Sequence, residues 1–174
     1  CPMRKHTGIR PQDIVILLKI ISYGQQSWFA KDLAISLFLS GSEVSESLNR
    51  SVYAGLMDST KKKVLKLNFS EFIIYGLRYT FPQQPGAMQR GMPTAISHPK
   101  IKARFPTDTQ FIWPDPTGTD LGWTIEPFYA KQVKAVKQDD SLYYMLCLID
   151  MIRTGKPREV NFAQEEIKKC FNES

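Results

Sequence analysis

Cysteine and histidine are scarce in this chain of 174 residues, which contains three cysteines and two histidines. Cys1, Cys147 and Cys170 are odd in number and far apart, which is more typical of a reducing compartment than of a disulfide framework. With only His6 and His98 beside them, the sequence has no zinc-ligand spacing. We therefore expect neither a metal nor another cofactor.

Sequence motifs of catalysis and of membrane insertion are missing as well. The chain has no nucleophile elbow, phosphate-binding glycine loop or paired-carboxylate site, and the neighbours Asp139 and Asp140 are better explained as charges at a helix start. The apolar run at residues 11–22 is far below the roughly 20 residues of a membrane span, and Lys19 interrupts it. No secretory signal is visible. These absences predict a cytoplasmic protein that is not an enzyme and does not bind a membrane.

The positive charge of the chain is unevenly distributed. Its net charge is +6 at pH 7, with 43% hydrophobic residues, enough for a packed core. Residues 1–80 contain 11 Lys and Arg against 6 Asp and Glu, whereas residues 81–174 contain 12 against 11. A basic excess confined to one half indicates that this half binds nucleic acid.

Within that basic half, residues 28–56 have the pattern of two helices joined by a tight turn. One face of the first helix carries Leu33, Leu37 and Leu39. The small side chain of Ala34 lies beside this face and allows a second helix to cross closely. Ser40 ends the first helix and caps the second, and Glu43, three residues later, completes a capping box.

The second helix, expected over residues 41–56, has one apolar and one polar face. Its apolar face carries Val44, Leu48, Val52 and Leu56. Its polar face carries Ser42, Ser45, Glu46, Asn49 and Arg50. Short polar groups and a guanidinium are what a recognition helix presents to base edges and phosphates. The alternative is an ordinary helical hairpin in a core, since amphipathic helices with this period are common.

The segment that follows, residues 57–67, predicts a short β-hairpin. A turn cluster at residues 57–60 leads into basic residues that alternate with Val64. A hairpin directly after a recognition helix is a wing, and its tip and outer face would carry Lys61, Lys62, Lys63 and Lys66. These lysines are expected to bind the phosphate backbone.

The pattern DLAISLFLSGSEVSESLNR, residues 32–50, resembles the core of the bacterial winged helix-turn-helix transcriptional regulators, in the broad style of the multiple-antibiotic-resistance regulators. The resemblance covers about residues 10–80 and implies DNA binding in the major groove, usually as a dimer. The chain departs from the pattern at Phe38, where the family prefers glycine in the turn. The carboxylates of Glu43 and Glu46 also repel phosphates, although they can accept from cytosine amino groups or cap the helix.

Residues 82–137 differ in character, because prolines and glycines punctuate them while aromatic residues still require burial. We expect short extended pieces at residues 109–113 and 122–126, in a segment that wraps over the helical core. Polar residues of the run RGMPTAISHP allow two interpretations: they form a small-ligand or nucleotide pocket, or they only hold a long loop in place through hydrogen bonds. The residues concerned are Arg90, Thr94, Ser97 and His98.

The remaining periodic segments predict helices. One covers residues 11–22 and is apolar around most of its circumference, and another starts at Asn68 and runs to about residue 81. A third runs from about Asp139 to Gly155, and a fourth starts at about Asn161. The last two could supply a dimer interface or only close the core of the monomer.

The predicted fold is therefore mostly α, in three parts. Residues 1–81 would form a winged helix-turn-helix DNA-binding domain, residues 82–137 an irregular segment rich in proline, glycine and aromatics, and residues 138–174 a helical hairpin. We expect a dimeric repressor that binds double-stranded DNA; the sequence does not indicate a small-molecule effector. The alternative is a winged-helix protein-interaction module, an antitoxin-like or adaptor subunit whose aromatic residues 111–129 bind a protein partner.

Overall fold

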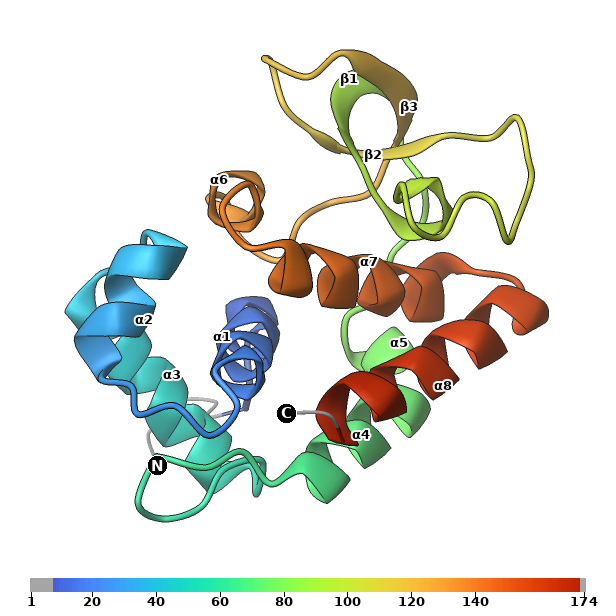
Figure 1. The fold of residues 1–174 in the computed structure, drawn as a ribbon. Helices are drawn as coiled ribbons and strands as arrows, with labels where there is room; N and C mark the ends of the chain where they lie inside the picture. Colours follow the sequence, from blue (N-terminus) through green and yellow to red (C-terminus); the bar gives the residue numbers. More distant parts are fainter. Residues whose placement is uncertain (1–7, 173–174) are drawn as a thin grey trace, which may run out of the picture.

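Helices dominate the computed structural model, which describes residues 8–172; Cys1 and His6 lie outside this range. The α-helices are α1 (Pro11–Ser22), α2 (Ala30–Leu37), α3 (Gly41–Tyr53), α4 (Lys66–Tyr75), α5 (Leu77–Thr80), α6 (Gln132–Val136), α7 (Asp140–Thr154) and α8 (Pro157–Asn172). The strands are β1 (Met88–Pro93), β2 (Phe111–Pro114) and β3 (Asp120–Thr124), and η1 (Ala95–Ser97) is a short 3₁₀ helix. The mostly helical prediction is confirmed, with one small sheet beside the helices (Figure 1).

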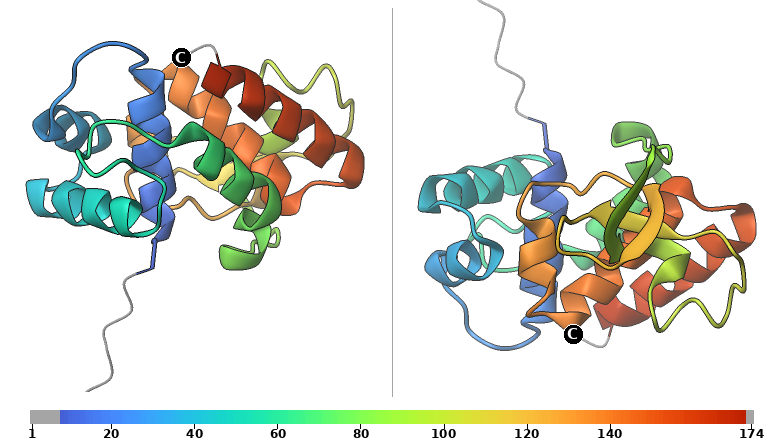
Figure 2. Two further views of the ribbon diagram at one scale, coloured as in Figure 1. Left: turned by 90° about the horizontal axis from the view of Figure 1, so that it is seen from below. Right: turned by 90° about the horizontal axis from the view of Figure 1, so that it is seen from above.

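Helix α1 is the centre of the arrangement. It runs between α2 and α3 on one side and α7 and α8 on the other (Figure 2), and it contacts α2, α3 and α7. Its residues 13–18 are all buried, as the apolar circumference of this segment predicts. Pro11 occupies its first turn, where the missing N–H costs nothing, and the carboxylate of Asp13 accepts from the backbone N–H of Arg10 at 2.8 Å.

A single hydrophobic core joins the three parts that the sequence suggested. It extends without a break from Ile14 in α1 to Phe171 in α8, where the ring of Phe171 stacks on Phe69 of α4 at a centroid distance of 5.5 Å. Most of α7 is buried within this core, and α8 covers it with one apolar face. The two C-terminal helices therefore close the core of the monomer, and their role in a dimer stays a prediction.

Several predicted helix boundaries are wrong. Helix α3 ends at Tyr53 rather than at residue 56. Helix α4 begins at Lys66 rather than Asn68, whose side chain instead donates to the carbonyl of Gly55, and the helix is interrupted at Gly76. Helix α8 begins at Pro157 rather than at Asn161. Proline ends one helix and equally well starts the next, because its fixed φ suits the first helical position. The prediction used Pro157 only as the stop of the preceding helix and not as the start of α8.

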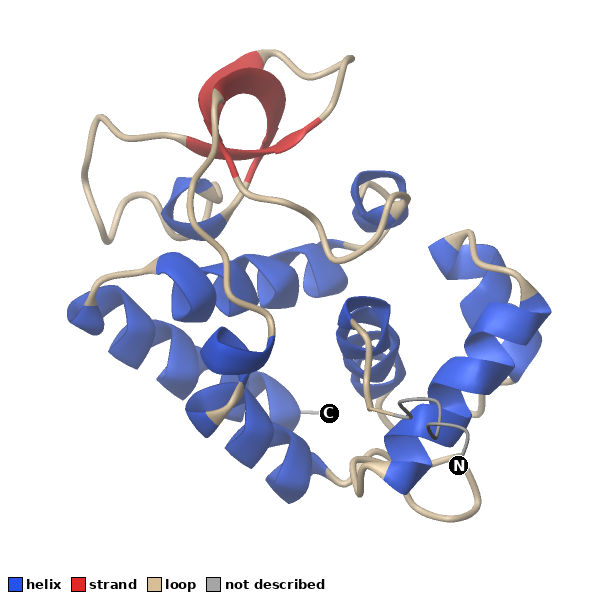
Figure 3. Ribbon diagram, turned by 180° about the vertical axis from the view of Figure 1, so that it is seen from behind, coloured by secondary structure: helices blue, strands red, loops and turns tan. Residues whose placement is uncertain are grey.

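The sheet curls so that each strand pairs with both others, and it lies on one side of the helices (Figure 3). Strand β1 is antiparallel to both β2 and β3, which are parallel to each other over two residue pairs. Strands β2 and β3 correspond to the predicted extended pieces, whereas β1 was not predicted. The curl depends on Gly91, because a Cβ there would overlap the carbonyl oxygen of Trp113.

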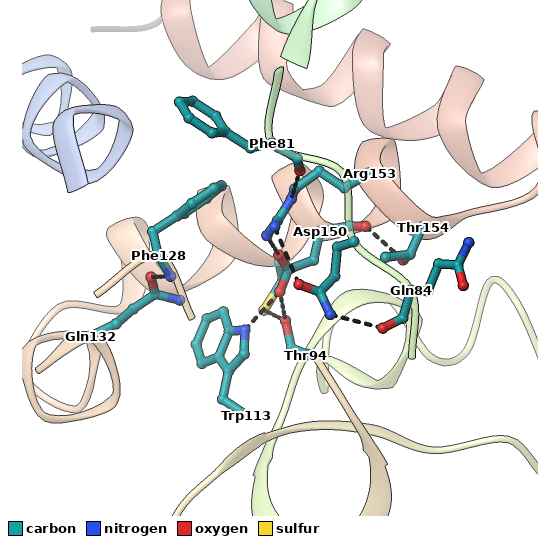
Figure 4. A network of polar contacts seen from close by, with 11 residues as sticks. Phe81, Gln84, Thr94, Trp113, Phe128, Gln132, Asp150, Arg153 and Thr154 are labelled. Carbon is teal, nitrogen blue, oxygen red and sulfur yellow. Dashed lines mark hydrogen bonds and ion pairs between the residues drawn. The ribbon is translucent and has the colours of Figure 1, made fainter. Parts of the chain in front are cut away.

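Asp150 on α7 holds the sheet to the helices through a buried polar network (Figure 4). Its Oδ2 accepts from Thr94 Oγ1 and from Trp113 Nε1, both at 2.7 Å. Its Oδ1 lies 3.3 Å from the guanidinium of Arg153, which also donates to the carbonyl of Phe81 at 3.0 Å. Burial raises the pKa of Asp150, whereas Arg153 and the two neutral donors act in the opposite direction. The network thus ties β1, β2 and the chain after α5 to one point on α7.

His98 is buried just after η1, against the rings of Tyr143 and Tyr144 at centroid distances of 4.5 and 5.4 Å. Its Nδ1 accepts from the backbone N–H of Lys100 at 3.0 Å. Burial and, to a smaller extent, the charge of Lys100 lower the pKa of His98 to about 4, although Asp140 acts in the opposite direction. The imidazole is therefore neutral in the folded protein at neutral pH.

An ion pair joins α1 to α3. Arg50 donates from Nε and Nη2 to the two carboxylate oxygens of Asp13, each at 2.8 Å. The side chain of Asp13 is fully buried and that of Arg50 is 11% exposed. A bidentate guanidinium is the partner that a buried carboxylate requires, because an unpaired charge in that position is strongly destabilising. This pair fixes the position of α3 relative to the central helix.

We predict that Arg50→Ala lowers the free energy of unfolding by about 3 kcal/mol, because the carboxylate of Asp13 is left buried without its cation. Chemical denaturation measures this change. Asp13→Asn in the Arg50→Ala background should recover part of the loss, since it removes the orphaned charge. Arg78→Ala, at an exposed position on α5, serves as the control and should change stability by less than about 0.5 kcal/mol. Equal losses for Arg50→Ala and Arg78→Ala would show that the pair does not stabilise the fold.

His98 predicts a loss of stability in mild acid. Its folded-state pKa lies below the ordinary value of 6.5, so the unfolded chain binds a proton more readily between pH 6.5 and 4. Stability from this group is complete above pH 6.5 and falls by about 2 to 3 kcal/mol as the pH approaches 4. Denaturation curves of the protein and of His98→Gln across this range isolate the effect. Both proteins contain the same carboxylates, so the contribution of carboxylate titration cancels in the comparison. Parallel pH profiles would contradict the prediction.

Candidate nucleic-acid interface

A tight turn joins α2 to α3 as predicted, and Ser40 caps the second helix, but the predicted end of the first helix at Ser40 is wrong, and Leu39 lies in the turn. Helix α2 ends at Leu37, Phe38 follows in the left-handed region with φ 56°, and Ser40 is the N-cap of α3. Left-handed backbone is where glycine is preferred, so Phe38 occupies the glycine conformation without being glycine. Its half-buried ring lies 4.4 Å from the ammonium of Lys134, a contact that offsets part of the strain. The turn therefore forms at Phe38 although this residue is not glycine.

The capping box at the start of α3 is confirmed. The hydroxyl of Ser40 accepts from the backbone N–H of Glu43 at 3.1 Å, and the carboxylate of Glu43 accepts from the backbone N–H of Ser40 at 3.1 Å. The negative charge of Glu43 is thus held at the positive end of the helix, where it is stabilising. Glu43 acts as a cap in this structure.

The polar face of α3 is exposed along most of its length. Four of the five predicted recognition residues lie exposed on this face: Ser42, Ser45, Glu46 and Asn49. Tyr53, one turn beyond Asn49, is 75% exposed and extends the same face, although the sequence analysis did not include it. An exposed tyrosine at helical spacing from Asn49 was the available signal. The face therefore combines hydroxyl, amide, carboxylate and phenol groups.

Arg50 does not belong to this exposed face, which corrects its sequence assignment. Its guanidinium is directed at Asp13 rather than away from the protein. The available signal was Asp13, the one carboxylate in a helix that is apolar around most of its circumference, since a carboxylate buried there needs a partner.

Two serines on α3, Ser47 and Ser51, are buried, and their hydroxyls have no hydrogen-bond partner in the described part of the chain. They occupy the side of α3 that packs toward the core, where a larger side chain would hold the helix further from its neighbours. The sequence pattern did not identify them, because serine is usually exposed. Their small size allows α3 to pack closely in the core.

The predicted wing is a compact loop rather than a β-hairpin. A single antiparallel bridge joins Met57 to Val64, and no strand is assigned in the described residues on either side. The carboxylate of Asp58 closes the loop by accepting from Thr60 Oγ1 and from the backbone N–H groups of Lys62 and Lys63. These hydrogen bonds lower the pKa of Asp58. The loop is held by a side-chain carboxylate in place of a strand ladder.

Two of the four predicted wing lysines are used within the protein. Lys62 donates to the carbonyl of Trp28 at 3.2 Å, with its ammonium 4.8 Å from the centre of the Trp28 ring. Lys66 lies in α4 rather than on the wing and donates to the carbonyl of Phe171 at 2.9 Å. Lys61 and Lys63 are exposed at the loop. The structure thus leaves a smaller basic surface than the sequence predicts.

The aromatic segment 111–129 serves mainly as core. Trp113 and Phe128 are buried, whereas Leu121 and Trp123 are 55% and 43% exposed. The exposed part is a small patch on β3, with Met88 of β1 paired opposite Trp123. It is much smaller than the full segment that the protein-interaction alternative would use.

The polar residues around Thr94 hold the loop in place through hydrogen bonds, as the second interpretation predicts. Thr94 donates to Asp150, the hydroxyl of Ser97 accepts from the backbone N–H of Phe111 at 2.9 Å, and His98 accepts from the N–H of Lys100. Only Arg90 of this set is exposed. The other three side chains are buried and hydrogen-bonded within the fold, which favours the second interpretation.

Within residues 8–172, no group of three or more His, Cys, Asp or Glu side chains is placed to hold a metal ion. No helix in this range combines the length and apolar character that crossing a bilayer requires.

Comparison with protein-family models, with curated proteins and with solved structures gives no match for this chain.

Proposed function

We propose that this protein binds double-stranded DNA as a winged helix-turn-helix regulator, with α3 in the major groove and the loop at residues 57–64 acting as the wing. The observation that carries the proposal is the α2–turn–α3 unit. Its left-handed turn residue and reciprocal capping box fix α3 with one polar face exposed. A rigid helix with an exposed polar face is the element that reads base edges in this class of protein.

The exposed groups on α3 suit direct readout of base pairs. The carboxamide of Asn49 can donate to and accept from the edge of adenine, and the carboxylate of Glu46 can accept from the amino group of cytosine. Ser42 and Ser45 have hydroxyls that donate or accept and therefore suit several bases. Glu43 is held by the cap, so its charge adds less repulsion toward phosphates than its place in the sequence suggests.

The free cations beside α3 would supply the sequence-independent part of the affinity. Lys61 and Lys63 project from the loop, and Lys31 is exposed in the first turn of α2. The packing of Lys62 on Trp28 and against Phe29, 5.4 Å from that ring, holds the loop next to the start of α2. Cations on both elements could then contact one phosphate backbone.

The protein-interaction alternative has weaker support. It depends on an exposed aromatic surface at residues 111–129, but Trp113 and Phe128 are buried and Phe111 and Tyr129 are partly buried, which leaves Trp123 as the exposed ring. A DNA-binding regulator requires no such surface. Regulation would follow from occupancy of a DNA site, and a two-fold dimer would place two copies of α3 about one DNA turn apart.

We predict that Lys61→Ala/Lys63→Ala weakens binding to random-sequence duplex DNA about tenfold at low salt. It should also reduce the slope of log K against log salt concentration by about 1.8, since each lost phosphate contact contributes about 0.9. Lys62 is left intact because it holds the loop. A titration series across salt concentrations gives both numbers.

The matched control for the loop lysines is Lys168→Ala/Lys169→Ala, which removes the same charge from exposed lysines on α8. It should leave the salt slope unchanged. Equal effects of the two double variants would assign the binding to overall charge, and unchanged binding in Lys61→Ala/Lys63→Ala would remove the wing from the proposal.

A second prediction concerns sequence preference. A preferred DNA site is first selected from a random library with the unaltered protein. Asn49→Ala should then reduce the preference for that site over random DNA by about 1 to 3 kcal/mol, while binding to random DNA changes little. Asn161→Ala, an exposed asparagine on α8, is the control. A preference that survives Asn49→Ala and Ser45→Ala would exclude α3 as the reading helix.

A further inference from the structure

A second feature lies at the other end of the molecule from α2 and α3, where the loop at residues 98–110 meets the junction of α7 and α8 (Figure 1). This end contains a cavity of about 470 Å³. Its lining includes three basic side chains and one acidic side chain: Arg104, Lys156, Arg158 and Glu159. The volume falls within the range of small-molecule sites, roughly 300 to 1,000 Å³.

The two arginines of the cavity are positioned by aromatic rings. The guanidinium of Arg104 lies 4.9 Å from the centre of the Phe162 ring, and that of Arg158 lies 5.8 Å from the Phe105 ring. These two rings pack edge to face at 5.3 Å. A guanidinium held by the face of a ring keeps its N–H donors available in its own plane. The rings therefore position the cations without using their hydrogen-bonding capacity.

Within the described residues, neither Arg104, Lys156 nor Arg158 forms an ion pair. The carboxylate of Glu159 is engaged instead with the backbone N–H of Lys156, at 2.9 Å. Three cations against one carboxylate leave the cavity with an excess of two positive charges. A phosphate monoester carries about 1.5 to 2 negative charges at pH 7 and matches this excess, whereas a single carboxylate would neutralise only half of it.

We propose that this cavity binds a small phosphate monoester attached to a planar ring, of the size of a nucleoside monophosphate. The phosphate would accept from the guanidinium groups of Arg104 and Arg158, in the bidentate geometry that favours arginine at phosphate sites. The ring would pack on Phe105 and Phe111, which line the same cavity. The hydroxyls of Thr107 and Thr109 are further partners at its edge. This site is separate from α3 and does not depend on the protein being a DNA-binding regulator.

The test is calorimetric titration of the whole protein at low ionic strength with AMP, and in parallel with inorganic phosphate and with adenosine. We expect saturable one-to-one binding of AMP at least about tenfold tighter than binding of either half alone, because both the phosphate and the ring have partners. Equal affinity for AMP and inorganic phosphate, or the absence of saturable binding of AMP, would overturn the proposal.

Variants then locate the site. Arg104→Gln/Arg158→Gln should weaken AMP binding about tenfold or more, while Lys168→Gln/Lys169→Gln on the same helix α8 should leave it unchanged. Glu159→Gln keeps a side-chain oxygen for the N–H of Lys156 and removes only the charge, so it should tighten AMP binding severalfold. This gain does not require the arginine variants to fold. Unchanged affinity in Glu159→Gln, or equal losses in both double variants, would overturn the assignment to this cavity.

Discussion

The ion pair between Asp13 and Arg50 is the constraint on which the arrangement of the N-terminal helices depends. A carboxylate buried at the start of α1 is tolerated only where a cation reaches it, and α3 supplies that cation. The pair therefore allows one placement of α3 against the central helix. That placement turns Ser42, Ser45 and Asn49 outward, so a buried electrostatic requirement orients the surface proposed to read DNA.

Local rules were enough to predict much of the helical architecture. Helix α1 and the capping box of Ser40 and Glu43 follow from propensities and short-range hydrogen bonds, which a sequence shows directly. The sheet did not follow in full, because β1 lacks an alternating apolar pattern. It is defined by its pairing with β2 and β3 and by the buried network of Asp150, which are long-range interactions.

The candidate site shows the same division between local and long-range effects. Exposure of Ser42, Ser45, Glu46 and Asn49 followed from helical periodicity. Periodicity did not show which cations are held within the protein, because each contact depends on a partner distant in the sequence. Arg50 pairs with Asp13, Lys62 donates to the carbonyl of Trp28, and Lys66 donates to the carbonyl of Phe171. A run of lysines in a sequence gives the number of charges but not how many remain free.

The number of free cations also bears on how the protein would occupy DNA. Among the described residues of α2 and the loop, Lys31, Lys61 and Lys63 are exposed and Lys62 is held by Trp28. In the proposed complex these three lysines would neutralise about three phosphates, so one copy would bind weakly through them at physiological salt. The association constant of two linked copies is roughly the product of the two single association constants and the effective concentration of the second copy. A basic surface this small therefore favours a dimer over a monomer as the DNA-binding form.

The C-terminal helices are largely occupied in closing the core, so the dimer contact would have to use another surface. The side chains of Leu67, Tyr75 and Tyr79, along α4 and α5, are 82%, 73% and 78% exposed and are one such surface.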